Sequence, residues 1–231
     1  MSDVIRAAYS FVLDGQGIPA STSPQTIQIA LQDATLPLGH AILLSCHQAF
    51  LKDYGALTVE EQRDSGLTLD DCPSPDSLLE LPQRVSYNAV VGNIHLYLVQ
   101  LLRYVANIDA TSLGDIHPSL KELGVLGFST GMIASTVIAC ADNIPRFISH
   151  ATEAFRLAFY MGLRAQQYCN RALPDVQMAD AASQSWTLVT FGSTRAEVQQ
   201  AVDKYLSDKV CTSSDPTLGR FSHTSLEAVC A

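Results

Sequence analysis

The sequence predicts an α/β fold in which helical segments outnumber strands. Three observations favour it: a short apolar run at residues 8–13 ends in the glycine-flanked loop 15–17, a second apolar run from residue 124 leads into a glycine-bounded turn, and apolar residues recur at helical spacing through most of the rest. Strands that alternate with helical segments are typical of a sheet covered by helices. The 231 residues suffice for one large domain, or for a domain with a small appendage.

After the first strand, the amino-terminal half is predicted to be helical. Apolar residues keep helical spacing through residues 23–54, and the pattern breaks around residues 37–39, which contain Pro and Gly. Two helices are therefore expected there. Residues 87–105 are apolar on most faces, which predicts a helix packed against neighbours on both sides.

Between these helices, residues 55–83 are polar and rich in turn residues, which indicates a connecting region. The Thr58–Glu61 stretch has the pattern of a helix start, and residues 77–81 are predicted to form a short helical turn.

The central motif is Gly127-Phe128-Ser129-Thr130-Gly131, a G-x-S-x-G pattern. This pattern is typical of a sharp strand-to-helix turn that exposes a nucleophilic side chain at the edge of a sheet. Ser129 is accordingly the candidate nucleophile. The alternative is an incidental serine in a buried turn, because a five-residue pattern with three fixed positions also occurs by chance.

Two helices are predicted after this motif. Residues 132–140 contain small side chains that allow a close approach to the sheet. Asp142 and Asn143 are predicted to cap a second helix that carries Pro145 in its first turn and runs to about Asn170.

The amino-acid composition and its pattern change beyond residue 174. Residues 174–185 are polar and alanine-rich, like a hinge, and residues 186–192 (WTLVTFG) predict a strand. Thr194 and Glu197 form a capping-box pattern at the start of the next helix. We therefore expect two parts, residues 1–178 and residues 179–231.

Composition bears on partners and location. The formal charge is −9, and the 14 Lys and Arg residues are scattered, so a nucleic-acid partner is not expected. The amino terminus lacks the apolar run of a secretory signal, and the longest uncharged run, 124–141, contains three glycines and fits strand, turn and buried helix better than a membrane span. A cytoplasmic protein without a membrane span is expected.

The cysteines predict neither a disulfide framework nor a metal site. They are far apart, without C-x-x-C and without His at zinc-ligand spacing. We expect reduced thiols, mostly buried as small apolar side chains: Cys46, Cys72, Cys140, Cys169, Cys211 and Cys230.

Taken together, these features resemble one family. GVLGFSTGMIAS, EAFRLAFYMGLRAQ and SWTLVTFGSTRAEVQQAV, between residues 124 and 206, are similar to the starter-unit acyl-carrier-protein transacylase domain at the amino terminus of fungal non-reducing polyketide synthases. The amino-terminal half is similar through FVLDGQG and the helix that contains Gln100. The resemblance implies an acyltransferase-like hydrolase core (strand, nucleophile elbow, helix) followed by a ferredoxin-like subdomain.

The resemblance also implies a ping-pong acyl transfer and roles for individual residues. Ser129 would attack an acyl thioester, and the phosphopantetheine thiol of a carrier protein would accept the acyl group. The backbone N–H of Thr130 would stabilise the oxyanion, since it lies at the amino end of a helix. Gln16 of the Gly-Gln-Gly loop would support the oxyanion; the alternative is a loop amide that holds its own turn.

Two departures from the family pattern affect the catalytic residues. The family usually has Cys where this chain has Ser129. The general base of the family is a histidine that follows a complete ferredoxin-like subdomain. Residues 186–231 of this chain are predicted to form one strand, one helix and a tail. The subdomain is therefore expected to be incomplete and the domain truncated. His223 is the candidate base, with a surface histidine as the alternative. The others are expected to be helix or loop residues: His40, His47, His95, His117 and His150.

The resemblance places Arg156 at the carboxylate-binding arginine of malonyl-type enzymes. Arg156 lies off the apolar stripe of its helix, so a solvated arginine fits the pattern as well. The substrate would be an acyl-CoA or an acyl-carrier thioester, the partner an acyl carrier protein or polyketide synthase, and no bound cofactor or metal is expected.

Two other functions compete with this one. A serine esterase of the α/β-hydrolase type shares the elbow but builds several strands before it, where residues 20–115 predict helices and loops. A catalytically inactive transacylase-like protein, serving as a binding module or a remnant, would keep the elbow and lack the base. The sequence alone does not decide whether this chain is an active enzyme, which acyl group it takes, whether it is part of a longer synthase, or its oligomeric state.

Overall fold

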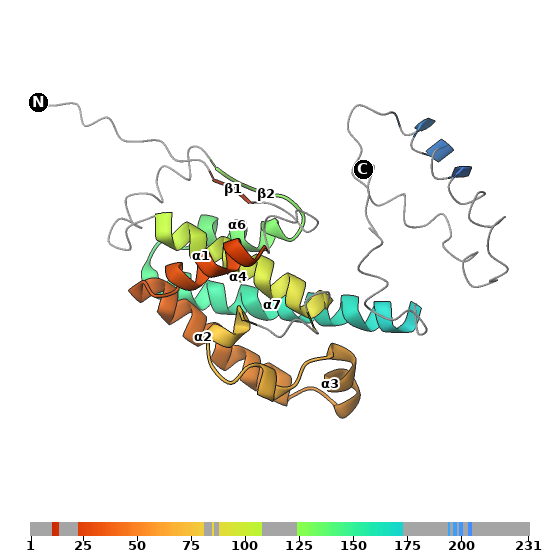
Figure 1. Ribbon diagram of the computed structural model, residues 1–231. Coiled ribbons are helices and arrows are strands. Elements are labelled where there is room, and N and C mark those ends of the chain that lie inside the picture. Colours follow the sequence, from red (N-terminus) through yellow and green to blue (C-terminus); the bar gives the residue numbers. More distant parts are fainter. Residues whose placement is uncertain are drawn as a thin grey trace, which may run out of the picture. The chain divides into compact units, whose positions relative to one another are not determined.

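The computed structural model describes residues 11–13, 23–80, 85, 88–107 and 124–172, together with scattered positions between 194 and 204. Helices dominate, and the strands β1 (Phe11–Leu13) and β2 (Val125–Gly127) pair in parallel as a small sheet. Figure 1 shows the two strands above the helices, with α6 (Gly131–Cys140) next to them. This is the predicted α/β class, with a larger helical share than a typical α/β domain.

The first two helices meet at a sharp bend. α1 (Pro24–Asp33) and α2 (Pro37–Gly55) are related by 108°. The break lies at residues 34–36, so the predicted position at 37–39 was too late: Pro37 is the first residue of α2, where proline costs no hydrogen bond. A Cβ at Gly39 would lie 2.6 Å from the Asp33 carbonyl oxygen, so the tight bend requires glycine there.

The connecting region is ordered by local caps. α3 (Val59–Ser65) begins with the predicted capping box, in which the Glu61 N–H donates to Thr58 Oγ1 and the Thr58 N–H donates to Glu61 Oε2. Two 3₁₀ turns follow, η2 (Leu69–Asp71) and η3 (Asp76–Leu78), the latter close to the expected turn.

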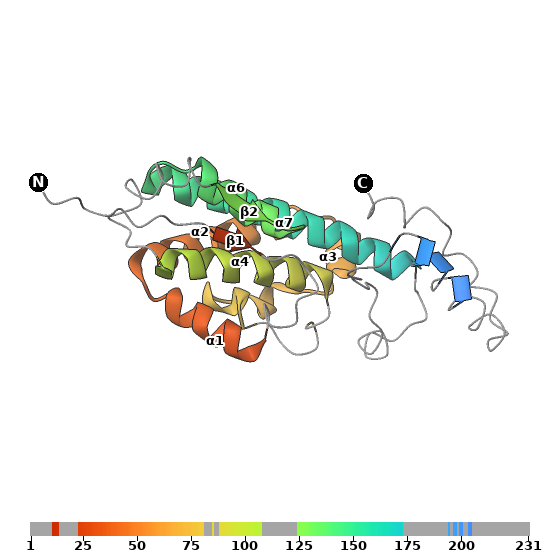
Figure 2. The same ribbon diagram turned by 90° about the horizontal axis from the view of Figure 1, so that it is seen from above.

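The core lies between α4 (Ala89–Asn107) and α7 (Ile144–Ala172), which run side by side in Figure 2. They approach so closely that a Cβ at Gly162 of α7 would lie 2.6 Å from Val90 Cα of α4. Asn143 caps α7 as predicted, accepting a hydrogen bond from the Arg146 N–H. The aromatic side chains of the α7 stripe are fully buried: Phe147, Phe155 and Phe159.

The helix α4 is also long and apolar enough to cross a membrane, but 72% of its apolar window is buried inside the protein. α1 and α2 reach the same criterion only when taken together across their bend. The burial of α4 is that of a core helix, which satisfies the same length and hydropathy test.

Contacts along the chain divide it into two compact units, Met1–Ser183 and Gln184–Ala231. In the second unit, the predicted capping box is present, with the Thr194 N–H donating to Glu197 Oε2 at 2.7 Å. The predicted strand at 186–192 lies outside the described residues, so the ferredoxin-like character of this unit stays a prediction.

The four described cysteines are free thiols. Cys46 and Cys72 are buried as expected, and burial raises the pKa of the Cys72 thiol to about 12. Cys140 and Cys169 are exposed instead, because they lie at helix positions that face away from the core. Within the described part of the chain, no group of His, Cys, Asp and Glu side chains has the geometry of a metal site.

Candidate active site

The turn between β2 and α6 has the backbone of a nucleophile elbow. Ser129 has φ = 51°, the left-handed region that side chains other than glycine rarely adopt, and it is the single non-glycine residue with positive φ in the described ranges. Its side chain is exposed. Because such a conformation costs of order 1–3 kcal/mol, the surrounding structure must hold Ser129 in place.

The two glycines of the motif explain how the turn is held. A Cβ on Gly127 would lie 2.5 Å from the Gly131 carbonyl oxygen and 2.6 Å from Ser135 Oγ, so the strand and helix approach each other too closely for any side chain. The Gly131 N–H donates to the Phe128 carbonyl at 2.8 Å, and the Phe128 N–H donates to the Leu13 carbonyl of β1 at 2.9 Å. The first glycine of the G-x-S-x-G pattern is therefore a packing requirement of this turn.

The amino end of α6 offers a hydrogen-bond donor beside Ser129. The N–H groups of Met132 and Ile133 donate to the carbonyls of Ser129 and Thr130, at 3.1 Å each. The Thr130 N–H donates to no residue in the described part of the chain. An N–H at a helix amino terminus carries the partial positive charge of the helix dipole, which suits a developing oxyanion.

The sheet register brings the end of β1 beside the elbow. Leu13 pairs with Gly127, so both parallel strands end at the same edge, two residues before Ser129. Gln16 follows Leu13 by three positions in the sequence and lies outside the described residues. A loop that leaves the carboxyl end of a neighbouring parallel strand is a common source of site residues.

The described part of the chain places no hydrogen-bond partner beside the Ser129 hydroxyl. Ser129 Oγ makes no hydrogen bond with any residue that the structure describes, and His223 and His117 lie outside that part of the chain. His40, His47, His95 and His150 are helix residues, as expected.

Two of these histidines are held by backbone contacts in the core. His47 Nε2 lies 2.9 Å from the Cys72 carbonyl oxygen. Burial lowers the pKa of His95 to about 4, opposed by a hydrogen bond with the Leu78 backbone. The surroundings of His47 and His95 are therefore those of side chains that support the fold.

Arg156 is bonded to carboxylates instead of lining a space beside the elbow. Its Nε and Nη2 donate to the two oxygens of Asp53 on α2, at 2.7 and 3.0 Å, and its Nη1 donates to Glu153 at 3.1 Å. The carboxyl of Asp53 is almost completely buried. These two carboxylates hold the pKa of the Arg156 guanidinium above its usual range, and the bidentate pair ties α7 to α2.

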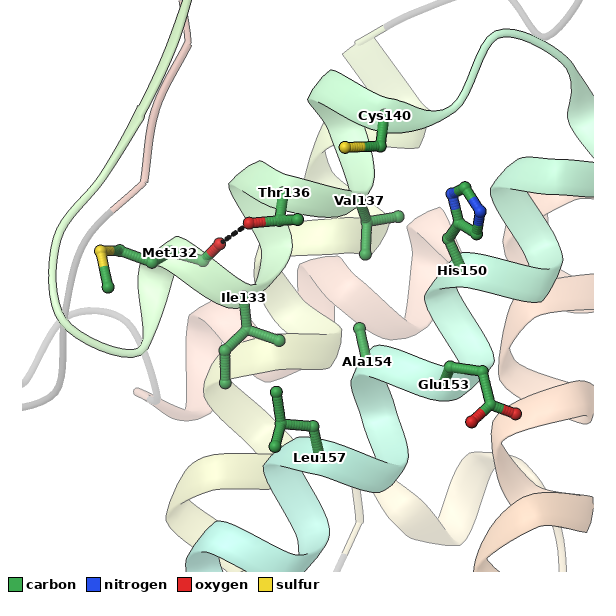
Figure 3. Close-up of a pocket in the computed structure, with 9 residues that line it drawn as sticks. All are labelled: Met132, Ile133, Thr136, Val137, Cys140, His150, Glu153, Ala154 and Leu157. Carbon is green, nitrogen blue, oxygen red and sulfur yellow. Dashed lines mark hydrogen bonds between the residues drawn. The ribbon is translucent and has the colours of Figure 1, made fainter.

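The structure reveals a groove that the sequence analysis did not identify. It lies between α6 and α7, starts at Met132 and has a volume of about 470 Å³ (Figure 3). Its α7 wall contains His150, Ala154 and Leu157, at the spacing of one helix face beside the core stripe. The apolar residues Ala154 and Leu157, which lie outside the core stripe, were the feature of the sequence that could have predicted the groove.

The chain is similar in sequence to a known protein family and to curated proteins. The family described as "Starter unit:ACP transacylase in aflatoxin biosynthesis" matches residues 21–229. Orsellinic acid synthase ArmB of Armillaria ostoyae is 33% identical over 84% of this chain, which covers 9% of that protein. The orsellinic acid synthase armB of Armillaria mellea is 31% identical over 84% of this chain and 9% of that protein.

A third relative, the non-reducing polyketide synthase albA of Aspergillus niger, is 29% identical over 48% of this chain and 5% of that protein. The chain thus spans less than a tenth of the length of these curated relatives. No solved structure matches it. Because the family match extends over most of the sequence and includes the elbow, the chain belongs to the starter unit:ACP transacylase family of fungal polyketide synthases.

Proposed function

We propose that this chain transfers a starter acyl group from a thioester to an acyl carrier protein in polyketide biosynthesis, through an ester on Ser129. The observation that carries the proposal is the conformation of Ser129, exposed and at φ = 51° between β2 and α6. A strained conformation at a turn that packs this tightly is typical of an active site. The acyltransferase-like hydrolase core of the family is the fold in which such a turn works.

In the first half-reaction, Ser129 Oγ attacks the carbonyl carbon of the thioester while a base takes its proton. The new C–O bond forms, the carbonyl oxygen becomes an oxyanion near the Thr130 N–H, and the C–S bond then breaks. The protonated base returns its proton to the departing thiolate. In the second half-reaction, the carrier's phosphopantetheine thiol attacks the ester, the C–O bond breaks, and Ser129 regains its proton.

Gln16 and His223 complete the proposed site. Gln16 would supply oxyanion support, because it follows by three positions in the sequence Leu13, the last residue of the strand that pairs with β2. His223 is the proposed base, because a serine has little nucleophilicity without one. Arg156 is proposed to bind a carboxylated acyl group only in a state in which its bonds to Asp53 are broken.

The substrate would be an acyl-CoA or an acyl-carrier thioester, with no bound cofactor. The partner would be the carrier domain of a polyketide synthase, and the setting the cytoplasm. These proposals rest on the family to which the chain belongs.

A second function, binding without catalysis, is favoured by one observation: no described side chain makes a hydrogen bond to Ser129 Oγ. In that case the elbow would be intact and unactivated. The chain would then bind a carrier or a synthase without forming an ester.

Intact-mass measurement decides between the two functions. The purified chain, Ser129→Ala and His223→Ala are incubated with acetyl-CoA and hexanoyl-CoA. We expect one acyl adduct on the unmodified chain, none on Ser129→Ala, and slower labelling of His223→Ala. Ser129→Cys serves as the matched nucleophile variant and is expected to form a thioester, because the family usually has Cys at this position.

If circular dichroism shows that the unmodified chain is folded and no adduct forms, the enzymatic proposal is contradicted. Binding of a carrier protein without labelling would then support the second function.

A further inference from the structure

The groove between α6 and α7 is continuous with the elbow. Met132, at its near end, belongs to the first turn of α6, and the Met132 N–H donates to the Ser129 carbonyl at 3.1 Å. The groove therefore begins one helical turn from the nucleophile. Figure 3 shows Met132 at one end and Cys140 with His150 at the other, with Ile133 and Leu157 between them.

The walls of the groove are apolar where they approach the elbow. Met132 and Leu157 keep 59% and 52% of their surfaces exposed. Of the nine described residues that line the groove, none is Lys or Arg. Large apolar side chains exposed around one concavity are typical of a ligand-binding surface.

Two polar side chains along the walls are bonded to other groups, whereas His150 Nδ1, at the far end, is buried without a hydrogen-bond partner among the described residues. Thr136 Oγ1 donates to the Met132 carbonyl at 2.8 Å, the hydrogen bond drawn in Figure 3. The carboxylate of Glu153 accepts hydrogen bonds from Arg156 at 3.1 and 3.3 Å. Arg156 is thus bonded to carboxylates, and an acyl chain in the groove would meet hydrocarbon along most of its length.

We propose that the groove between α6 and α7 binds the alkyl chain of the acyl group carried by Ser129, that this chain is uncharged and longer than acetyl, and that Leu157 contacts it. The inference rests on the proposed function, which supplies the acyl group. A volume of about 470 Å³ lies within the range of small-molecule sites and far exceeds the need of a two-carbon group. Each methylene buried there improves binding about fourfold.

The test separates binding from acyl transfer. Affinities of acetyl-, butyryl-, hexanoyl- and octanoyl-CoA are measured by calorimetry on Ser129→Ala, and rates of adduct formation are measured on the unmodified chain. We expect both to rise about fourfold for each added methylene until the groove is filled.

Leu157→Trp fills the groove and is expected to bring the hexanoyl-to-acetyl ratio of affinities close to one. Ala154→Leu fills it from its floor and repeats the test if the first variant folds poorly. Leu51→Trp is the matched control, because Leu51 is also a partly exposed leucine within a helix, on α2 and outside the groove. It should keep the chain-length dependence of the unmodified protein.

Equal affinities for acetyl- and hexanoyl-CoA, or a ratio unchanged by both groove variants, would overturn the proposal even where Ser129 is acylated. Chain-length-dependent binding that Leu157→Trp abolishes would support it even where no adduct forms, and the proposed transfer reaction alone would then fail. A preference for malonyl-CoA over butyryl-CoA would also overturn it.

Discussion

In the α4–α7 pair the interface side chains are buried, whereas in the turn between β2 and α6 the side chains of Phe128, Ser129 and Met132 are exposed. Both regions depend on glycines at close contacts: Gly162 lets α7 approach α4, and Gly127 lets β2 approach α6. The first contact increases the apolar area removed from water. The second holds a serine in a backbone conformation that is unfavourable by itself.

The difference indicates that tight packing and exposed, strained backbone lie in separate regions of the molecule. The helical core supplies a rigid support on which the small sheet and its elbow rest, because α6 contacts both strands and both core helices. The strain of the elbow is offset by packing elsewhere, as expected for an active site built on a stable scaffold.

Replacing Gly162 by valine should produce the largest loss of stability. The new Cβ would lie 2.6 Å from Val90 Cα and 2.8 Å from the Ala89 carbonyl oxygen, and both are backbone atoms that cannot move independently. We expect the free energy of unfolding to fall by about 3 kcal/mol or more, measured by urea denaturation. Gly55→Ala is the control, because nothing lies within 4 Å of a Cβ there; an equal loss in both variants would contradict the packing argument.

Acidification should weaken the packed region through His95. Burial lowers the pKa of its imidazole from 6.5 to about 4 in the folded chain, so between these values the unfolded state binds more protons. The stability contribution is complete above pH 6.5 and is lost as the pH falls towards 4, by as much as about 3 kcal/mol.

Chemical denaturation of the unmodified chain and of His95→Gln between pH 4 and 7 measures this contribution. The variant should show a flatter pH dependence in that range. Parallel curves for the two proteins would exclude His95 as the source.

Introducing a glycine at position 129 of the elbow should increase stability, whereas replacing the glycine at position 162 should decrease it. At φ = 51°, Ser129→Gly adopts the left-handed conformation without the steric cost of a Cβ, whereas Ser129→Ala keeps that cost. Both variants lack the hydroxyl, so neither should be acylated. We expect Ser129→Gly to be more stable than Ser129→Ala by about 1–2 kcal/mol; equal midpoints of thermal unfolding, or a more stable alanine variant, would indicate that the turn is unstrained.

The smallest expected effect lies outside both regions, at the cap of α3. Thr58→Ala removes the Oγ1 that accepts the Glu61 N–H at 3.2 Å and should cost about 1 kcal/mol of unfolding free energy. Thr58→Ser keeps the cap and should cost much less. A loss as large as that of Gly162→Val would show that α3 is part of the cooperative core.

Several local features could be predicted from the sequence because their causes are local. The capping boxes at Thr58 and Thr194, the cap at Asn143 and the glycine-bounded elbow are each determined by residues within five positions of one another. The position of the first bend was predicted three residues too late, because Pro37 was interpreted as a helix breaker when it begins α2.

Other features depend on residues far apart in the chain. The partner of Arg156 is Asp53, more than a hundred positions earlier, and the sequence pattern allowed either a substrate-binding or a solvated arginine. The groove combines one face of α6, from Met132 to Cys140, with one flank of α7, and no single segment contains it.

The sequence by itself therefore determined the family, the position of the glycine-bounded turn and most helix boundaries, because helical periodicity, caps and the G-x-S-x-G turn act over a few residues. Only the tertiary structure decided that Ser129 is held in a left-handed conformation, that Arg156 is bonded to α2, and that an apolar groove begins beside the elbow. These depend on how α2, α6 and α7 pack, and packing is set by contacts between residues that the sequence separates.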